Sequence, residues 1–375
     1  MPLIGQRSRL NRCNGDGVKI AQTMDKPNVT AIKGRGAADN PQGRFEKLAR
    51  DRDENGDAPS RPQTVITLQQ ARSIIARNDS PDLPFSQSIN PYQGCEHGCI
   101  YCYARPSHSY LGLSPGLDFE SRIFGKENAA SLLRKELSRP SYRCELVSLG
   151  ANTDPYQPAE REHQITRGIL EVLWEFRHPV GIVTKGSLIE RDLDLLEPMA
   201  RDGLVQVFIS VGSLDGEIAR TLEPRAAAPF RRVETLRRLS AHGVPCGVLV
   251  APVIPFLNDK DMEAVLEAAA GAGARMAGYT LLRLPWEVKD LFRTWLEQHY
   301  PLRASHIMAR VRDMRGGRDN DPAFGSRMKG EGQFAQLLRN RFKVACSRLG
   351  LNADKPERPD GSKFRKPPAL QGSLF

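Results

Sequence analysis

The 375-residue sequence has little that would place it in a membrane or outside the cell. No apolar run approaches the roughly 18 residues that a membrane-spanning helix needs. Residues 1–17 contain no hydrophobic stretch of signal-peptide length, so we expect a cytoplasmic protein with no membrane partner. Cysteine is scarce, with seven in the whole chain. Without an export signal, metal-binding or catalytic thiols are a better interpretation of these cysteines than a disulfide framework.

An excess of acidic residues is also absent, and the formal net charge is +10. The excess of positive charge is local: residues 300–375 hold 16 Lys and Arg against 7 Asp and Glu, whereas residues 61–299 have a net charge of −2. A basic patch attracts nucleic acid through counterion release. The alternative is a solvated helical surface that continues into a basic tail. Nucleic acid is therefore one candidate partner.

Strand-like and helical patterns alternate between residues 86 and 285. Continuous apolar runs separated by amphipathic helices predict a parallel sheet that is covered on both faces. Periodicity alone does not distinguish an open doubly wound sheet from a partial barrel. The expected strands are 88–93, 145–151, 180–185, 204–212, 244–253 and 276–284. The expected helices are 127–137, 165–177, 189–200, 230–243 and 261–273.

The two ends of the chain differ from this core, which we place at residues 61–285. Residues 1–60 are predicted to be disordered, because they mix Gly, Asn, Asp, Arg and Pro with few aromatic residues. Residues 286–350 are predicted to form a basic helical extension, and residues 351–375 a disordered basic tail rich in Pro and Lys. The expected helices of the extension are 288–300, 302–317 and 331–350.

The most informative motif is NPYQGCEHGCIYCYARP, in which Cys95, Cys99 and Cys102 follow a C-x3-C-x2-C spacing. Three thiolates within eight residues can wrap a loop around one metal centre, and soft thiolates bind zinc or iron–sulfur clusters. A structural zinc site needs a fourth ligand, which His97 or His108 would have to supply. A [4Fe–4S] cluster held by only three cysteines leaves one iron open to bind a reactant.

This motif, placed after a first strand and before alternating strands and helices, resembles that of the radical S-adenosylmethionine (SAM) superfamily. The resemblance implies a partial (β/α)6 TIM-like barrel with a helical C-terminal extension. It also implies a [4Fe–4S] cluster on Cys95, Cys99 and Cys102, with SAM as the second cofactor. Such an enzyme cleaves SAM reductively to a 5′-deoxyadenosyl radical, which abstracts a hydrogen atom from the substrate. An electron donor such as flavodoxin or ferredoxin would be a partner.

Over roughly residues 85–285, the sequence also resembles, through less specific matches, the branch that contains spore photoproduct lyase and its relatives. That family has Tyr-Cys-Tyr at the third cluster cysteine, and Tyr101, Cys102 and Tyr103 repeat it here. The resemblance implies that Tyr101 lies at the cofactor site. Tyr103 becomes the candidate catalytic residue.

Further matches imply SAM-binding residues at the ends of strands, where parallel α/β folds bind ligands. Lys185 and Arg232 are suited to the carboxylate of the methionine moiety, because cations pair with carboxylates in a partly dry site. Asn152 and Thr153 offer hydrogen bonds at the end of a strand. With Tyr101, the implied cofactor-binding set comprises Asn152, Thr153, Asp154, Lys185, Ser210 and Arg232, where Arg232 follows a Glu223-Pro224 pair at the family's spacing.

One position departs from the lyase pattern. In the lyase, a Cys immediately before the strand-end Thr-Ser-Asp stretch supplies a hydrogen atom to the substrate radical. Ala151 stands at that position here. The resemblance therefore does not extend to the lyase activity itself, and Tyr103 is left as a participant in hydrogen transfer. Cys144 and Cys246 are interpreted as small buried hydrophobic residues.

The last five residues, QGSLF, are similar to the short Gln-x-x-Leu-Phe peptides that DNA repair and replication proteins place in the bacterial sliding clamp. Gln371 can act as an anchor, and Leu374 and Phe375 can fill a small apolar groove. The sliding clamp is therefore a second candidate partner.

Three functional hypotheses follow. The first is a radical SAM enzyme that acts on DNA, in photolesion repair or another base modification. The second is a radical enzyme that modifies RNA, a protein or a small molecule, with the basic region only solvated. The third is a non-catalytic protein, associated with DNA or the clamp, whose cluster is structural.

Overall fold

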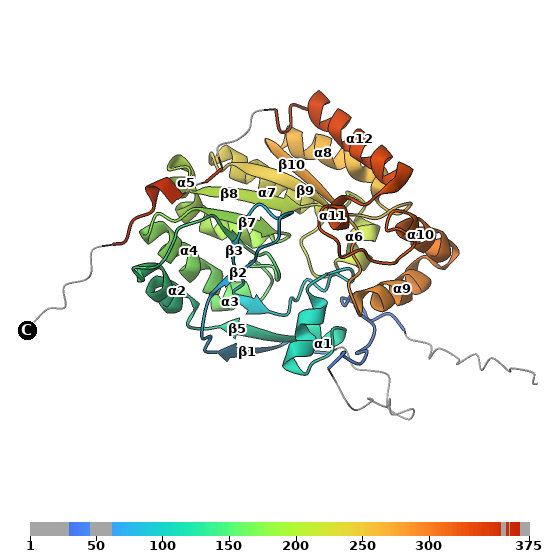
Figure 1. Cartoon of the computed structure of the whole chain (residues 1–375), viewed down its shortest axis with the longest axis horizontal. Coiled ribbons are helices and arrows are strands. Elements are labelled where there is room, and N and C mark those ends of the chain that lie inside the picture. The colour runs from blue at the N-terminus through green and yellow to red at the C-terminus, as the bar shows by residue number, and fades with distance from the viewer. Residues whose placement is uncertain (1–29, 46–61, 354–357, 360, 368–375) are drawn as a thin grey trace, which may run out of the picture.

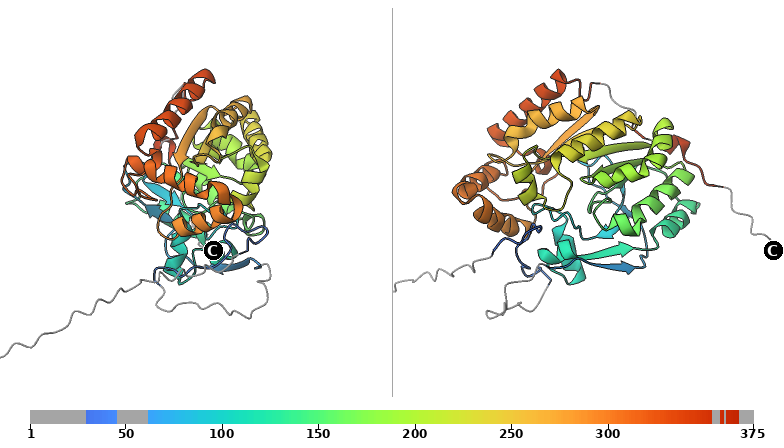
Figure 2. Two further views of the ribbon diagram at one scale, coloured as in Figure 1. Left: turned by 90° about the vertical axis from the view of Figure 1, so that its right-hand side faces the viewer. Right: turned by 180° about the vertical axis from the view of Figure 1, so that it is seen from behind.

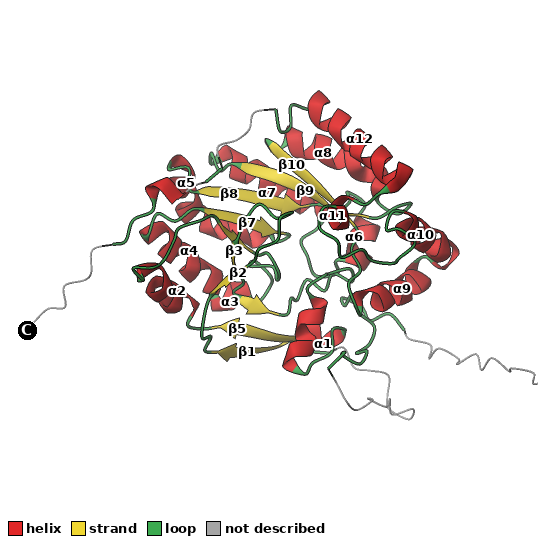
Figure 3. Ribbon diagram, viewed as in Figure 1, coloured by secondary structure: helices red, strands yellow, loops and turns green. Residues whose placement is uncertain are grey.

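Seven strands form the main sheet of the computed structural model, which describes residues 30–45, 62–353, 358–359 and 361–367. Six neighbouring strands are parallel, and β2 is antiparallel to β3 at one edge. No pairing joins β10 to β2 in the described part of the chain, so the sheet is open on one side (Figure 1, Figure 3). The predicted partial (β/α)6 barrel is confirmed. In spatial order the strands are β10 (Met276–Leu281), β9 (Cys246–Val253), β8 (Val205–Ser210), β7 (Val180–Thr184), β6 (Val147–Leu149), β3 (Gln87–Ile89) and β2 (Ile75–Arg77).

Amphipathic helices follow the parallel strands and cover their outer face. In Figure 2 the green-to-orange helices lie side by side over the back of the sheet. Helix α4 buries Ile169, Leu170 and Leu173 against it, which matches the spacing of apolar residues on one helix face. Because the strands are covered in this way, β7 and β9 are buried along most of their length. The covering helices are α2 (Ala129–Ser138), α4 (Ile165–Glu175), α5 (Leu193–Arg201), α7 (Pro229–Ala241) and α8 (Met262–Gly271).

The basic extension is helical, as the sequence predicts. Trp295 is buried at the centre of one apolar cluster, where its ring lies 5.5 Å from that of Phe292. Tyr279 of β10 and Phe342 hold the last long helix on the sheet, with ring centroids 4.7 Å apart. No helix in the described ranges is long and apolar enough to cross a membrane. The helices of the extension are α9 (Val288–His299), α10 (Pro301–Asp313), α11 (Ser326–Lys329) and α12 (Gly332–Arg348).

A second, three-stranded sheet was not expected. Its strand order is β1-β5-β4, with β1 parallel to β5 and β4 antiparallel to β5. The partners are far apart in the sequence, so local periodicity carries no signal for them. The strands are β1 (Val65–Gln69), β4 (Tyr92–Gln93) and β5 (Arg122–Lys126). The short helix η2 (Ser187–Asp192) overlaps the start of the expected helix 189–200. The short helices η1 (Arg105–Leu111), α1 (Leu117–Ser121), α3 (Glu160–His163), α6 (Gly216–Leu222), η3 (Asp259–Asp261) and η4 (Gly361–Lys363) were not expected.

Residues 30–45 are packed, although the sequence predicts disorder up to residue 60. Ala37 is buried, and a Cβ atom on Gly36 would lie 1.8 Å from the carbonyl oxygen of Gly98. Only glycine therefore allows this segment to approach the cysteine loop so closely. The amides of Gly36 and Ala37 donate to the carboxylate of Glu120. These contacts span more than 80 residues of sequence, which composition cannot reveal.

Part of the predicted basic tail is also packed. The ring of Phe364 lies 5.7 Å from that of Tyr142 and 5.5 Å from that of His178. The amide of Arg365 donates to the carbonyl oxygen of Phe176. The proposed clamp-binding residues Gln371, Leu374 and Phe375 lie outside the described residues, and so does Cys13.

Candidate active site

The loop between β4 and η1 carries the three cysteines of the motif. Cys95, Cys99 and Cys102 are all free thiols, the first two buried and the third half-buried. Two turns bend the loop back on itself: the amide of Gly98 donates to the carbonyl of Cys95, and that of Cys102 to the carbonyl of Cys99. Burial raises the pKa of the Cys99 thiol to about 12. Deprotonating this buried thiol therefore costs free energy. Coordination to a metal centre offsets that cost, because metals bind the thiolate.

The donor set fits an iron–sulfur cluster. Within the described residues, no three His, Cys, Asp or Glu side chains converge on one point as ligands of a single ion do. A four-iron cluster sets a different requirement, because each cysteine binds a separate iron. The two histidines considered as fourth zinc ligands face other groups. His108 Nε2 lies 2.9 Å from the carbonyl oxygen of Arg122, and His97 Nδ1 lies 3.3 Å from the carboxylate of Asp154.

A fully buried arginine holds the cysteine loop in shape. Arg105 donates to the carbonyl oxygens of Cys99 and Gly98, and also to the Glu120 carboxylate. Two further bonds reach the carbonyl oxygens of Pro115 and Gly116, so all five guanidinium donors have acceptors. Neither member of this ion pair was predicted from the sequence. The position of Arg105, three residues after the last cysteine, could have indicated a role in the loop. Nothing in the sequence pointed to Glu120.

Asp154 ties the loop after β6 to its neighbours. Its carboxylate accepts hydrogen bonds from the Thr184 hydroxyl at 2.6 Å and from the backbone amide of Lys185 at 2.7 Å. Burial alone would raise the pKa of this carboxyl, but His97 and these hydrogen bonds lower it overall. The carboxylate is thus engaged within the protein. Asp154 therefore acts as a positioning residue between the cysteine loop and the end of β7.

Tyr101, Glu223, Arg232 and Ser210 form one buried chain. The Tyr101 hydroxyl donates to Glu223, Arg232 forms an ion pair with the same carboxylate, and Arg232 Nη1 donates to the Ser210 carbonyl oxygen at 2.9 Å. Burial would raise the pKa of Glu223, but the charges of Arg232 and Lys185 lower it overall. The structure thus brings these predicted residues together, and the charge of Arg232 is paired with that of Glu223 within the protein.

Lys185 lies beside this chain with its charge unpaired. Its Nζ is 5.9 Å from the centroid of the Tyr101 ring, and no hydrogen bond or ion pair reaches that ammonium from the described residues. Burial would lower the pKa of Lys185, but the negative charges of Cys99 and Glu223 raise it overall. Of the two cations predicted for the SAM carboxylate, Lys185 is therefore the one that is available.

The two polar residues after β6 have different surroundings. The Thr153 hydroxyl donates to the carbonyl oxygen of Tyr92 at 2.7 Å, so it is engaged within the protein. The backbone amide of Asn152 donates to the Asn90 side chain at 2.8 Å. The Asn152 side chain is half-buried, and no hydrogen bond involves its amide group in the described part of the structure. Asn152 is thus the better placed of the two to contact a ligand.

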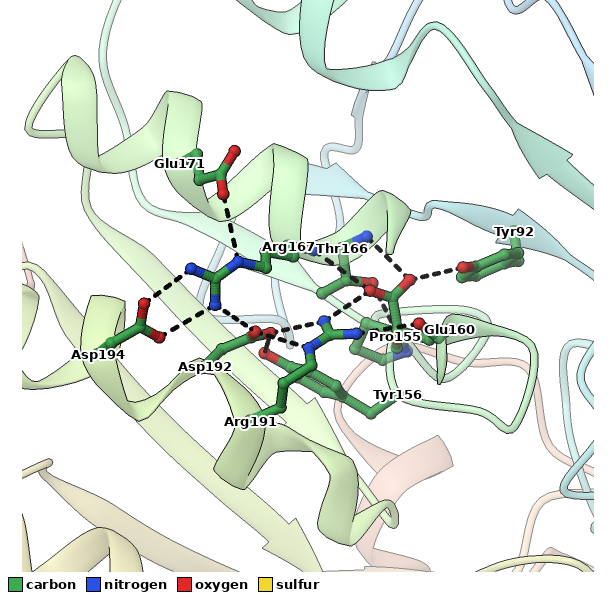
Figure 4. Close-up of polar contacts among 10 residues, drawn as sticks. All are labelled: Tyr92, Pro155, Tyr156, Glu160, Thr166, Arg167, Glu171, Arg191, Asp192 and Asp194. Atoms are coloured by element: carbon green, nitrogen blue, oxygen red, sulfur yellow. Dashed lines mark hydrogen bonds and ion pairs between the residues drawn. The ribbon is translucent and has the colours of Figure 1, made fainter. Parts of the chain in front are cut away.

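A network of charged and polar side chains holds the loop after β6 in place (Figure 4). The Glu160 carboxylate, which is fully buried, accepts hydrogen bonds from the Tyr92 hydroxyl at 2.5 Å and from Arg191 at 2.8 Å. Arg191 also binds Asp192, which accepts a hydrogen bond from the Tyr156 hydroxyl. The network links β4, α3 and η2, and thereby fixes the loop that carries Asn152.

Tyr103 lies between the ends of β6 and β10, at Ala151 and Arg283, a region here called the mouth of the site. Its hydroxyl donates to the carbonyl oxygen of Ala151, just after β6. On the other side, the guanidinium of Arg283, just after β10, lies 5.5 Å from the centroid of its ring. The side chain is 48% exposed, so the predicted catalytic residue is open to a substrate.

Comparison with known proteins agrees with this geometry. The family model described as "Radical SAM superfamily" matches residues 89–269. An uncharacterised protein of Mycobacterium tuberculosis is 34% identical over 316 residues, which cover 83% of this chain and 88% of that protein. The chain belongs to the radical SAM superfamily. It is therefore a radical SAM enzyme, and membership implies the [4Fe–4S] cluster and SAM as its cofactors.

This radical SAM enzyme is also similar to one more uncharacterised protein and to solved structures. An uncharacterised protein of Methanocaldococcus jannaschii is 27% identical over 214 residues, covering 57% of this chain and 76% of that one. A solved structure of spore photoproduct lyase complexed with dinucleoside spore photoproduct has a TM-score of 0.54 at 16% identity, and covers 76% of this chain and 80% of the lyase. A solved structure of a cysteine-to-serine mutant of the lyase gives a TM-score of 0.52 at 15% identity with the same coverage. These likenesses show a shared fold. The roles of the individual site residues stay predictions.

Proposed function

We propose that this radical SAM enzyme acts on DNA, in lesion repair or base modification. The observation that carries the proposal is the position of the basic extension. Residues 300–375 hold 16 basic and 7 acidic residues, and α11 of this segment packs beside β10, whose end forms part of the mouth. A second support is the shared fold with a lyase that binds a dinucleoside photoproduct.

Each of the chain's own groups has a role in this proposal. When bound, the cluster and SAM supply a carbon radical that can abstract a hydrogen atom. Cys95, Cys99 and Cys102 hold the cluster, and Lys185 binds the carboxylate of SAM. Tyr103 faces the substrate, where its hydroxyl can transfer a hydrogen atom in place of the lyase cysteine.

SAM cleavage is the first test. The cluster is reconstituted anaerobically, dithionite and SAM are added, and 5′-deoxyadenosine is quantified by mass spectrometry. We expect product from the wild type and none from a variant with all three motif cysteines replaced by alanine. Cys246→Ala is the matched control, because that thiol is buried in β9 away from the loop. A wild-type protein with a full cluster and no product would contradict the proposed chemistry.

The substrate class is tested by adding ultraviolet-irradiated DNA, plain DNA, tRNA or protein to the same reaction. We expect DNA to accelerate SAM turnover, with retention on duplex DNA that falls steeply as salt rises, because phosphate contacts release counterions. Acceleration by RNA or protein alone would favour the second hypothesis. Membership of the superfamily supports a catalytic protein over the third hypothesis, a structural cluster.

A further inference from the structure

Arg283 is a half-buried cation that forms no ion pair with an acidic side chain among the described residues. It follows β10, at the C-terminal end of the last barrel strand. Its Nε is buried and has no hydrogen-bond partner. The hydrogen bond found for its guanidinium is a weak one, from Nη1 to the sulfur of Met328 at 3.7 Å. Buried donors are normally paired, and the described residues supply no acceptor for this one, so a ligand could supply it.

Other buried arginines of this chain show the contrast. All five donors of Arg105 have acceptors, and Arg232 is paired with Glu223. Arg315, which also packs near the end of β10, donates to four backbone carbonyl oxygens. These three guanidinium groups are satisfied within the protein. A buried Nε without a hydrogen-bond partner also occurs in Arg310 of α10 and Arg339 of α12, but Arg283 combines it with a position at a strand end beside Tyr103.

The nearby carboxylate is already engaged. Asp82, in the loop between β2 and β3, binds Arg327 through two nitrogens, one of them Nε at 2.7 Å. Burial lowers the pKa of Arg283, and the charge of Arg327 acts in the same direction. Asp82 and Tyr103 act in the opposite direction, but the Asp82 carboxylate is already paired with Arg327, and no ion pair to Arg283 is found among the described residues.

The guanidinium also faces the open part of the site. Its Cζ atom lies 5.5 Å from the centroid of the Tyr103 ring, which is half exposed. Tyr103 is fixed at its other end by the Ala151 carbonyl. A ligand group bound by Arg283 would therefore sit next to the residue predicted to exchange a hydrogen atom with the substrate.

We propose that Arg283 binds a phosphodiester group of the substrate beside Tyr103, and so helps to select a nucleic acid. This inference rests on the proposed function, because it names the part of the DNA that the mouth recognises. A planar guanidinium matches two oxygens of a phosphate at once. Lys185, nearer the cysteines, remains for the carboxylate of SAM. Lys185 and Arg283 are thus assigned to two different anions.

The test compares a charged with an uncharged backbone. Fluorescein-labelled hexathymidylate and its methylphosphonate analogue, which lacks the phosphate charges, are titrated into the reconstituted enzyme with SAM, and anisotropy is recorded. We expect Arg283→Gln to weaken binding of the charged oligomer by about tenfold or more. Arg283→Lys, which keeps the charge and loses the two-pronged geometry, should fall between. Arg237→Gln removes the same charge from the exposed face of α7 and should change binding less than about twofold.

Three results would overturn the inference. One is equal affinity of the wild type and Arg283→Gln for the charged oligomer, where the melting temperatures show that both proteins are folded. Another is no binding of either oligomer by the wild type. The third is a rise in the half-saturating SAM concentration of Arg283→Gln as large as the loss of oligomer binding, which would place the guanidinium on the cofactor. Failure of the proposed chemistry is distinguishable, because oligomer binding is measured without turnover.

Discussion

The hydroxyl of Tyr103 donates a hydrogen bond to the backbone carbonyl oxygen of Ala151. Ala151 is the residue that stands where spore photoproduct lyase has its hydrogen-donating cysteine. Because the bond uses the backbone, it is independent of the side chain at position 151. The tyrosine hydroxyl is therefore held beside residue 151, and the side chain at 151 can be varied without releasing it.

Tyr103→Phe tests whether this hydroxyl transfers hydrogen. We expect product formation to fall by about tenfold or more while 5′-deoxyadenosine is still formed, because the hydroxyl acts only after the radical has been generated. Products and 5′-deoxyadenosine are quantified in one reaction. Tyr110→Phe is the matched control, since Tyr110 is 72% exposed on η1. Equal product yields from Tyr103→Phe and the wild type would remove Tyr103 from the mechanism.

Arg105→Gln should destabilise the fold by about 3–5 kcal/mol, because it leaves Glu120 as a buried charge without its cation. Both side chains of this pair are fully buried. The free energy of unfolding is measured by urea titration of the protein. The comparison is Arg134→Gln, whose partner Glu175 is on the surface, and which should cost under about 1 kcal/mol. A loss of equal size in both variants would contradict the structural role given to Arg105.

Gly36→Ala should loosen the segment that covers the cysteine loop, since its Cβ would meet the Gly98 carbonyl. We expect a cost of about 1–3 kcal/mol, with faster loss of iron in air. Gly216→Ala is the control, because no atom lies within 4 Å of the added Cβ. Iron release is followed by absorbance. Equal rates of release from the two variants would show that residues 30–45 do not protect the loop.

His178 should make stability depend on pH. Burial lowers its pKa from 6.5 to about 4, so the folded protein holds it neutral. Below pH 6.5 the unfolded chain binds a proton that the folded chain does not, and stability therefore falls as pH falls from 6.5 to 4. The full loss is about 3 kcal/mol. Urea titrations of wild type and His178→Gln from pH 7.5 to 4 measure it, and parallel curves for the two proteins would count against this assignment.

The C-terminal peptide remains a proposal that needs its own measurement. We expect the full chain to retain a bacterial sliding clamp in a pull-down. Replacement of Leu374 and Phe375 by alanine should abolish it, because the two apolar side chains fill the groove. Arg237→Gln serves as the control for non-specific charge effects. Equal retention of the clamp by the double variant would exclude this partner.

Local sequence patterns predicted the elements that depend on neighbouring residues. The six parallel strands and their covering helices follow from apolar runs of strand length and from helical spacing. The cysteine spacing likewise identified the loop that the structure places at the strand ends. By contrast, Glu120 and residues 34–41 carried no signal, because their contacts join segments more than 80 residues apart. The pairing of Arg232 with Glu223 was missed for a related reason, since the motif gave a cation without its tertiary partner.

The ion pair between Asp82 and Arg327 links the two sides of the sheet that no strand pairing joins. Asp82 belongs to the β2–β3 loop, and Arg327 to α11 beside β10. Hydrogen bonding to Arg327 lowers the pKa of Asp82 to about 2, so the contact is charged at neutral pH. The barrel is thus joined along its seam by a mostly buried ion pair between side chains, which salt screens only weakly, where a closed barrel would have hydrogen bonds between backbones.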